Sequence, residues 1–498
     1  MNEFLLGVQA GVQLPVLLAL AAGSILGLVV GVLPGIGPGV AISILLPLTY
    51  GMSPLAGITL LLGIYCGAFY GGAVTSILIR TPGEASSIMT MFDGYPMARR
   101  GESERALSLA FSSAFLGGIA SVIVLIFAAA PLAGLTSRFG AAEYASASIL
   151  ALICVARAYE GRFFAAAMMV GLGLFIASMG IDPTSNDQRY TFGMTALLSG
   201  LPLAPLVIGL FGIAQAAILI GSPVVNVSGD AVSGAGIGVR HMLEPFRYRA
   251  TLSKSIGIGV GIGILPAVGA ALSTTLAYFE ARRASTDPAS FGKGNPEGIV
   301  AAEAANNSNS GGAMLTVLTL GIPGDAITAM IMGVFIVHGV VPGPALFTEQ
   351  PQLANGILFS MLLINVFTLG VLLFATRYLA MLTRVNPRIL GMAILMLCLV
   401  GSYSVGNSMA GIWVALGAGL LGWLCAHAGI PVVPLVLGVI LGDMLETTIR
   451  QALSISEGSP MIFLNRPVAA GILGFSALML FWPLLMRIFR RLKALNAP

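Results

Sequence analysis

A seven-residue motif occurs twice in the chain, each time inside a strongly apolar stretch. The first copy is Gly31-Val-Leu-Pro-Gly-Ile-Gly37 and the second is Gly263-Ile-Leu-Pro-Ala-Val-Gly269, at an offset of 232 residues. Other matches keep the same order at offsets of 240, 241 and 229: Gly71-Gly72-Ala73 with Gly311-Gly312-Ala313, Pro82-Gly83-Glu84 with Pro323-Gly324-Asp325, and Pro205 to Gly209 with Pro434 to Gly438. The order is kept and the offsets drift little, which indicates a duplicated chain.

The composition indicates a membrane protein. Of the 498 residues, 57% are hydrophobic and only 9% are charged, whereas soluble domains carry about 25% charged residues. A membrane-spanning helix needs roughly 20 mainly apolar residues, and stretches such as 106–130 and 196–221 meet that length. The alternating pattern of a transmembrane barrel is absent. We therefore predict an all-α polytopic membrane protein with about 10–12 transmembrane helices.

The matched motifs divide the chain into repeats. We predict repeat one over residues 1–221, an inter-repeat linker over 222–252, repeat two over 253–450, and one extra C-terminal helix with a basic tail over 451–498. The predicted crossings of repeat one are about 54–79, 105–130, 143–158, 163–180 and 196–221. An odd number of crossings turns the second copy over, which predicts two inverted-topology repeats.

The basic residues give an orientation, because Lys and Arg in short loops mark the cytoplasmic side. By this rule the 80–105 segment, the linker and the C-terminus are cytoplasmic. No basic residue precedes Arg80, so the N-terminus is placed outside, opposite the cytoplasm.

The second copy of the motif has the pattern of a re-entrant hairpin. Ser255–Glu280 carries basic residues at both flanks, with Pro266 and Gly269 at its middle. Proline removes a backbone donor and glycine permits positive φ, so both break a helix. Residues 33–39 are the partner tip, which we predict to open from the other face. A kinked helix packed through glycines is the alternative for one motif alone, but two matched copies are typical of a transporter binding site.

Freed N–H groups at such tips can bind anionic oxygens, and amide and hydroxyl side chains suit carboxylates and hard cations. We predict substrate contacts from these residues: Pro34, Gly35, Ile36, Gly37, Pro38, Gly72, Thr75, Ser76, Pro266, Ala267, Gly269, Asn309, Ser310, Gly311 and Gly312. A sodium site is predicted at Asn306, Asn307 and Ser310. For Asn306 a polar loop that caps a helix beginning near Ala313 is an equal alternative.

Three acids need separate interpretations. Glu84 and Asp325 each follow Pro-Gly, where an acid in the first turn of a helix is ordinary; this interpretation is favoured over a proton relay. Asp443 lies in an apolar run, where an acid can ligate a cation or carry a proton. Pairing of Asp443 with Arg450 is favoured, because repeat one has only neutral residues at the matching place.

Several enzyme classes lack their motifs. The chain has no Gly-x-x-x-x-Gly-Lys-Ser/Thr phosphate loop, no dinucleotide fingerprint and no His-Glu-x-x-His. Its three histidines are scattered and its four cysteines are isolated. We therefore expect no enzymatic activity, no cofactor other than a coupling cation (sodium or a proton), and no nucleic-acid partner.

The motifs resemble the large membrane subunit of the tripartite tricarboxylate transporters, the TctA family. The resemblance rests on these runs: Gly31 to Gly39, Tyr70 to Leu78, Thr81 to Glu84, Asp93-Gly-Tyr-Pro-Met-Ala98, Glu303 to Gly312 and Gly321 to Asp325. It implies a multi-pass protein of the bacterial inner membrane that works with a small four-span membrane subunit and a periplasmic solute-binding protein. It also implies uptake of citrate-like or other small carboxylates, driven by a cation gradient.

The sequence thus predicts a secondary active importer of small organic anions that works by alternating access in the lipid bilayer. A passive organic-anion channel is the alternative, because symmetric hairpins also build channel filters.

Overall fold

The structure is a computed structural model that describes residues 2–33, 36–159, 161–182, 185–222, 236–266, 268–382 and 385–495. The first half contains α1 (Asn2–Gly11), α2 (Leu14–Val32), α3 (Gly37–Thr49), α4 (Pro54–Ile79), η1 (Ala85–Ser87), α5 (Ile88–Arg99), α6 (Ser103–Thr136), α7 (Ala141–Ala158), α8 (Phe163–Ala177), β1 (Gly180–Ile181), β2 (Gln188–Arg189), η2 (Thr195–Leu197), α9 (Leu203–Val207), the π-helix η3 (Ile208–Ile213) and α10 (Ala214–Gly221).

The second half is also helical. It contains η5 (Val239–His241), η6 (Glu244–Tyr248), α11 (Arg249–Ile264), α12 (Gly269–Ala284), η7 (Pro288–Ser290), α13 (Pro296–Leu320), α14 (Ala326–Val337), α15 (Pro344–Glu349), α16 (Pro351–Met381), α17 (Pro387–Ser404), α18 (Met409–Ala428), α19 (Val433–Ile455), α20 (Ile462–Asn465) and α21 (Pro467–Leu495). Helices lie at the five predicted crossings of repeat one, as α4, α6, α7, α8 and the continuous run from α9 to α10, which begins at Leu203 rather than near residue 196. That each of them crosses the membrane stays a prediction.

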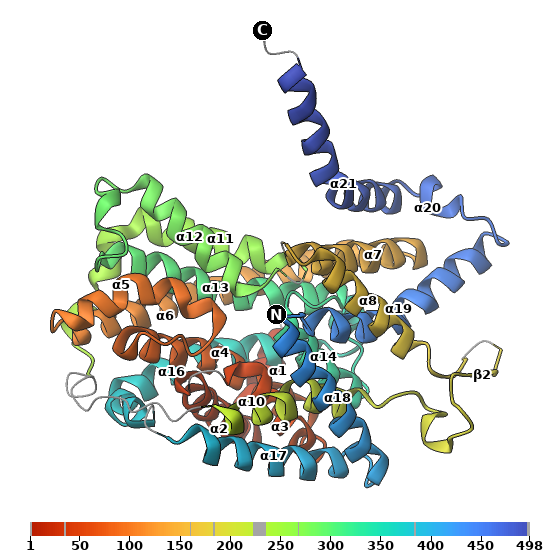
Figure 1. Cartoon of the computed structure of the whole chain (residues 1–498), viewed down its shortest axis with the longest axis horizontal. Helices are drawn as coiled ribbons and strands as arrows, with labels where there is room; N and C mark the ends of the chain where they lie inside the picture. The colour runs from red at the N-terminus through yellow and green to blue at the C-terminus, as the bar shows by residue number, and fades with distance from the viewer. Residues whose placement is uncertain are drawn as a thin grey trace. The chain divides into compact units, whose positions relative to one another are not determined.

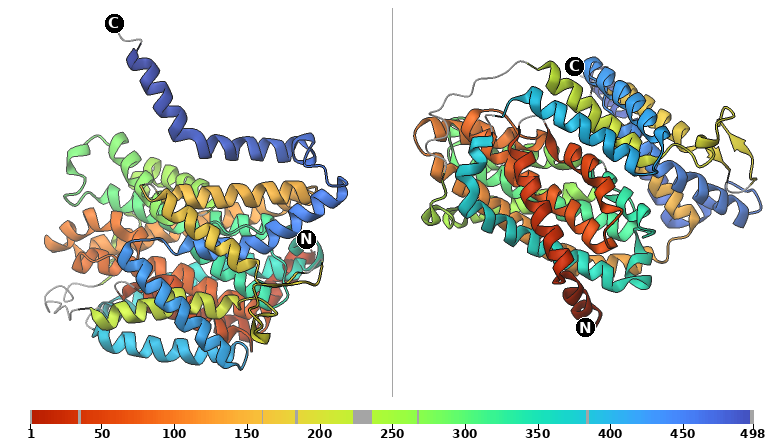
Figure 2. Two further views of the ribbon diagram at one scale, coloured as in Figure 1. Left: turned by 45° about the vertical axis from the view of Figure 1, so that its right-hand side comes forward. Right: turned by 90° about the horizontal axis from the view of Figure 1, so that it is seen from below.

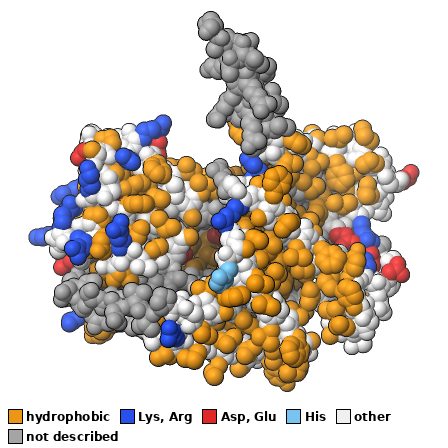
Figure 3. Space-filling model, in the orientation of Figure 1, with side chains coloured by type: hydrophobic (Ala, Val, Ile, Leu, Met, Phe, Trp, Pro, Cys, Tyr) orange, Lys and Arg blue, Asp and Glu red, His pale blue; other side chains and the backbone are white. Residues whose placement is uncertain are grey.

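The surface is that of a membrane protein. Within the described part of the chain, eight helices are long and apolar enough to cross a membrane. Large apolar side chains such as Phe127 and Phe374 are 76% and 83% exposed, and hydrophobic side chains cover much of the face in Figure 3. Such surface would be costly in water but matches lipid. The prediction of an all-α polytopic membrane protein is therefore confirmed.

The chain forms two compact units that do not coincide with the predicted repeats. The first unit comprises residues 1–136 and 202–424, and the second comprises residues 137–201 and 425–498. Both broken motifs lie in the first unit, where the helices form the layered bundle that Figure 1 shows from red through green to cyan. In the second unit α7 and α8 pack against α19, and α7 also packs against α21.

Each broken motif separates two helices of a hairpin, α2–α3 and α11–α12. The helices restart at Gly37 and Gly269, whose φ angles are +61° and +74°. Other residues adopt this left-handed conformation at a cost of roughly 1–2 kcal/mol, which explains the matched glycines. The α11 and α12 arms pack against each other, and Lys254 pairs with Glu280 at 3.8 Å at their polar ends. Both basic flanks therefore lie at one end of the hairpin, as predicted.

Each hairpin packs on a long buried helix in the same register. The Gly31 backbone abuts the carbonyl of Ala68 in α4, and the Gly263 backbone abuts the carbonyl of Asn309 in α13; neither glycine has room for a Cβ. The hairpin positions are 232 residues apart, and the long-helix positions, 68 and 309, are 241 apart. Close backbone approach through glycine is the usual reason for such packing in membranes.

Two further contacts show that the matched register is 241 rather than 240. Gly71 abuts the carbonyl of Leu28, whereas Gly312 abuts that of Val260. Gly71 therefore corresponds to Gly312. The Gly-Gly-Ala alignment predicted from the sequence, which matched Gly71 with Gly311, is wrong by one residue.

The matched elements also exchange partners across the first unit. Helix α6 packs on α13, whereas α16 packs on α4. In the same way α14 packs on α3, and η1 packs on α12. Figure 2 gives further views of these layers, with α2 to α6 in red to orange and α11 to α14 in green. The two halves are thus interlocked, with each supplying the covering elements of the other.

The candidate substrate site

The structure describes most of the predicted tip residues. Pro34, Gly35 and Ala267 lie outside the described residues. At the first tip the side chains of Ile36 and Pro38 are buried. At the second tip Pro266 and Gly269 are half-buried.

Helix α14 connects the two hairpins. A Cβ on Gly269 would lie 3.9 Å from the Cβ of Asp325 at the start of α14. One turn farther along α14, the Met330 sulfur lies 3.9 Å from the Ser43 hydroxyl of α3. The hairpins are therefore joined through α14 rather than being two unrelated features of the fold.

The remaining predicted contacts lie on the long helices. Gly72, Thr75 and Ser76 are buried in α4, and the polar run from Asn306 to Gly312 is buried in α13. This run lies in the middle of a continuous helix that begins at Pro296, so the alternative of a loop capping a helix near Ala313 is wrong. Packing of α13 against α6, α11 and α12 overrides the weak helix propensity of Asn, Ser and Gly.

The polar run divides into residues that are satisfied within α13 and residues that are not. Asn307 donates to the Glu303 carbonyl at 3.3 Å, and the Ser310 hydroxyl donates to the Asn307 carbonyl at 2.7 Å. By contrast, Asn306 is fully buried with neither its amide nitrogen nor its oxygen hydrogen-bonded. Asn309 accepts a hydrogen bond from Ser273 of α12 at 2.8 Å, and its amide nitrogen has no partner. Buried polar atoms without partners need an explanation, and a bound ion, ligand or water is one of them.

Asp325 has a structural role that agrees with its sequence interpretation. Its Oδ1 accepts from the backbone N–H and the hydroxyl of Thr328, at 2.7 and 2.8 Å, which caps α14. Its Oδ2 accepts from the Tyr65 hydroxyl of α4 at 2.6 Å. Sequence reasoning missed Tyr65, because nothing in the chain links two positions 260 residues apart.

A second buried acid fastens the base of the α11–α12 hairpin. The Oδ1 of Asp93 in α5 accepts backbone N–H groups from Gly292, Gly294 and Asn295, each at 2.8 Å. Its Oδ2 accepts from the Tyr278 hydroxyl of α12 at 2.8 Å. Asp93 is fully buried, and its motif Asp93-Gly-Tyr-Pro therefore holds the connection between α12 and α13.

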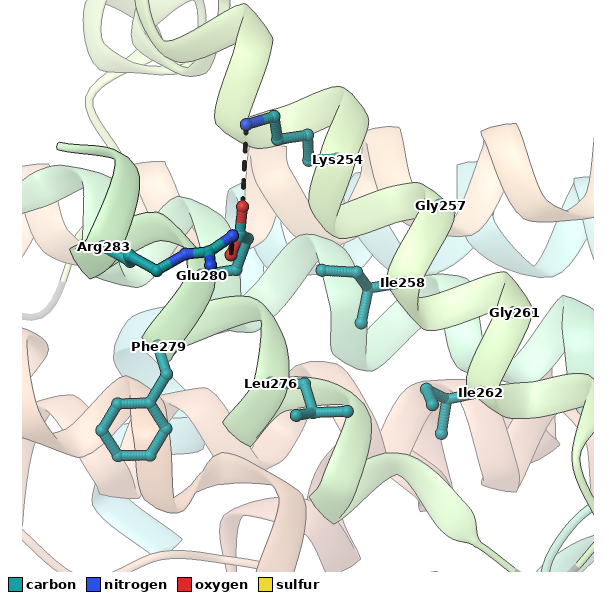
Figure 4. Close-up of a pocket in the computed structure, with 9 residues that line it drawn as sticks. All are labelled: Lys254, Gly257, Ile258, Gly261, Ile262, Leu276, Phe279, Glu280 and Arg283. Atoms are coloured by element: carbon teal, nitrogen blue, oxygen red, sulfur yellow. Dashed lines mark ion pairs between the residues drawn. The ribbon is translucent and has the colours of Figure 1, made fainter. Parts of the chain in front are cut away.

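A groove of about 770 Å³ runs along the α11–α12 hairpin (Figure 4). Apolar side chains such as Ile258, Leu276 and Phe279 line most of it, and Glu280 at one end pairs with Arg283 at 2.7 Å. The groove contains none of the predicted substrate or cation residues. Its apolar surface offers little to a carboxylate, so the groove does not compete with the tips and the polar run as the candidate site.

Asp443 belongs to the second unit and has an exposed side chain. The expected pairing with Arg450 is wrong, because Arg450 pairs with Asp182 at 2.8 Å and with Glu446 at 2.7 Å. Glu446 also pairs with Arg189 at 2.6 Å. These ion pairs fasten the β1–β2 hairpin to α19.

Metal chemistry based on acids and histidines is not seen in the described residues. Over that part of the chain, no group of three or more His, Cys, Asp and Glu side chains is placed to hold a metal ion. The polar run of α13 adds amide and hydroxyl oxygens, which can also serve as cation ligands.

Two glycine-broken hairpins, each packed on a long buried helix in an apolar polytopic bundle, are typical of membrane transport proteins. The chain matches the Tripartite tricarboxylate transporter TctA family over residues 17–437 and belongs to that family. It is therefore the large membrane subunit of a tripartite transporter rather than an enzyme, and the predicted resemblance is confirmed.

Two relatives come from Agrobacterium vitis. The "Uncharacterized 52.8 kDa protein in TAR-I ttuC' 3'region" is 34% identical over 444 residues, which are 87% of this chain and 86% of the relative. The "Uncharacterized protein in TAR-II ttuC' 3'region" is 34% identical over 225 residues, 45% of this chain and 93% of the relative. No solved structure matches the chain.

Proposed function

We propose that this subunit imports small carboxylates, of the tricarboxylate or citrate-like kind, by cation-coupled alternating access. The observation that carries the proposal is the pair of hairpins packed in one register on α4 and α13, with unpartnered amide groups buried on α13. Backbone broken in this way is tolerated at membrane depth only where it is buried or lines a cavity.

Asn309 is the substrate contact that the structure supports best. Its oxygen is fixed by Ser273, so its amide nitrogen is oriented and keeps two hydrogens without an acceptor. A carboxylate would accept those hydrogens. Gly269 leaves the backbone at the neighbouring tip free of a side chain, so backbone N–H groups there can add to the site.

The proposed motion follows from the contacts of α14. This helix packs on α3, and Asp325 at its N-cap lies beside Gly269 of the other hairpin. A shift of α14 would therefore move the surroundings of both tips together, which alternating access between two faces requires.

The partners and orientation belong to the same proposal. A small four-span membrane subunit and a periplasmic solute-binding protein would complete the system, and the chain would lie in the bacterial inner membrane. Its N-terminus would be periplasmic, and the linker and C-terminus cytoplasmic. Periplasmic labelling of a cysteine placed at Arg247 would contradict this orientation.

Uptake into proteoliposomes tests the function. The chain, its small subunit and the binding protein would be reconstituted, and labelled citrate would be followed with an inward sodium or proton gradient. We expect accumulation above the external concentration; strictly downhill flux would favour the alternative of a passive channel.

Asn309→Ala should reduce the uptake rate at least about tenfold, because a hydrogen bond to a charged group contributes roughly 1.5–3 kcal/mol. The matched control is Asn355→Ala, since Asn355 donates to the Pro351 carbonyl of its own helix at 2.9 Å. Equal uptake by the two variants would remove Asn309 from the site.

A further inference from the structure

The 241-residue register pairs Glu84 with Asp325, but the two acids have different surroundings. Asp325 is saturated by Thr328 and Tyr65, as described above. The Glu84 carboxylate makes no hydrogen bond to the backbone of the helix start that follows it. In the described part of the chain it accepts from the Ser86 hydroxyl and interacts with Asn306 of α13. We call the copy of the motif at Asp325 the closed copy, because its carboxylate oxygens are hydrogen-bonded. The copy at Glu84 is the open copy, because its carboxylate can still accept hydrogen bonds or bind a ligand.

The neighbours of Glu84 also leave polar groups without partners and space without a side chain. Ser87 corresponds to Thr328; its hydroxyl is buried and has no hydrogen-bond partner, whereas the Thr328 hydroxyl bonds Asp325. Gly72 corresponds to Ala313. A Cβ on Gly72 would meet the Ser87 hydroxyl and would lie 3.2 Å from Cγ of Glu84. The closed copy thus accommodates the methyl group of Ala313, whereas a methyl group at Gly72 would fill the space beside Glu84 and Ser87 in the open copy.

Helix α13 adds two further groups near Glu84: Glu303, which is close enough to interact with it electrostatically, and Asn306. Glu303 is fully buried; one of its carboxyl oxygens accepts from the Thr90 hydroxyl, and the other has no partner. Asn306, one turn farther along α13, interacts with Glu84 and leaves its own oxygen and nitrogen without hydrogen bonds of normal geometry. The first-repeat counterpart of Glu303 is Leu62, so the second carboxylate is present only in the open copy.

The charges of this cluster are not balanced by protein cations. Among the ion pairs of the described residues, none joins Glu84 or Glu303 to a lysine, arginine or histidine. Buried carboxylates are ordinarily paired or bind a cation, because burying an isolated charge is costly. Glu84 is only half-buried, which gives an ion a route to the cluster.

We propose that Glu84, Ser87, Glu303 and Asn306 form a binding site for one sodium ion. The proposal rests on the proposed function, in which such an ion would couple to carboxylate uptake. A hard cation takes carboxylate, amide and hydroxyl oxygens, and all three kinds face this place. A proton would use a carboxylate but would leave the oxygen of Asn306 and the hydroxyl of Ser87 without a ligand.

This site differs from the one predicted by sequence. Asn307 and Ser310 each donate to a carbonyl within α13; we leave them out of the proposed site, and their role as ligands stays a prediction. Glu84, Ser87 and Glu303 take their place, and Asn306 is common to both. The polar run alone does not form the site; the η1–α5 segment of the other repeat completes it.

Sodium binding to the purified full chain tests the proposal without any transport measurement. Binding of ²²Na⁺ to the protein in nanodiscs would be measured with choline as the replacing cation, together with the thermal midpoint in each salt. We expect saturable binding, a higher midpoint in sodium, and at least about tenfold weaker binding for Glu303→Gln, because even outer-shell partners of a bound ion contribute roughly 10–100-fold.

Two further variants guard against a folding artefact. Gly72→Ala keeps every charge and should weaken binding by occupying the cavity. Glu143→Gln breaks the ion pair of Glu143 with Arg466 at 2.9 Å and should lower the midpoint in both salts while leaving sodium affinity within about twofold of the wild type.

Absence of sodium binding by the wild type, unchanged binding by both Glu303→Gln and Gly72→Ala, or an equal loss in Glu143→Gln would each overturn the site. Sodium binding that follows the expected pattern in a protein that accumulates no carboxylate would instead refute the proposed function and leave the site standing.

Discussion

Removing the Asp93 carboxylate should release the connection between α12 and α13. The carboxylate holds three backbone N–H groups at 2.8 Å and the Tyr278 hydroxyl at 2.8 Å. Asp93→Ala would leave these donors buried without an acceptor, and each such loss costs about 1–3 kcal/mol. Losses around one acceptor are not additive, so we take about 3 kcal/mol as the expected local destabilisation.

Hydrogen exchange measures this cost where it arises. The amides of Gly292, Gly294 and Asn295 should exchange about 100-fold faster in Asp93→Ala, because each 1.4 kcal/mol is a factor of ten. Peptides from α4, which does not depend on this connection, should keep their protection. Asp287→Ala is the matched control, since Asp287 lies in the same connection with an exposed side chain.

Exchange within about threefold of the wild type at these amides, in a protein that still folds, would refute the reasoning. It would mean that packing of Tyr278 and the rest of α12, and not the carboxylate, holds the connection in place.

Two further predictions concern the tips and the linker. Gly37→Ala and Gly269→Ala should each reduce uptake at least about tenfold without loss of membrane insertion, because alanine is forced into a left-handed conformation that costs roughly 1–2 kcal/mol. The control Gly171→Ala, at open space in α8, should transport normally. Normal uptake by both tip variants would remove the tips from the site. The hydrogen bond and the charge of Arg105 lower the pKa of the Glu244 carboxyl below its ordinary value of 4.5. The ion pair therefore stabilises the fold above pH 4.5, and this stabilisation is lost as the pH falls through the lowered pKa. Below about pH 5 the thermal midpoint of the wild type should fall more steeply than that of Glu244→Gln, and parallel curves would contradict this account.

The hairpins were predictable because the sequence carries their local causes. The Leu-Pro-x-x-Gly motif breaks a helix. Basic residues on both sides of residues 255–280 indicate that both ends of this segment lie on the same side of the membrane. The structure places the breaks at these motifs, with positive φ at Gly37 and Gly269.

The polar cluster was not predictable in the same way. The run from Asn306 to Gly312 has the composition of a loop, and only packing against neighbouring helices keeps it helical. Glu84 and Asp325 look equivalent in sequence. Their difference depends on which residue of the other repeat faces each of them, Asn306 or Tyr65, and this is decided by the exchange of partners between the halves. The one-residue error in aligning α4 with α13 hid that correspondence.

The exchange of partners has a consequence for how the protein is made. Tyr65 can form its hydrogen bond only after Asp325 has been synthesised, 260 residues later. At ordinary rates of translation this delay is roughly 10–50 s. During that time α4, whose side chains are almost all buried in the finished fold, has neither α16 nor α14 to cover it. The first half therefore cannot mature alone in the bilayer. Separately expressed halves should be degraded individually and should survive only when both are produced in the same cell.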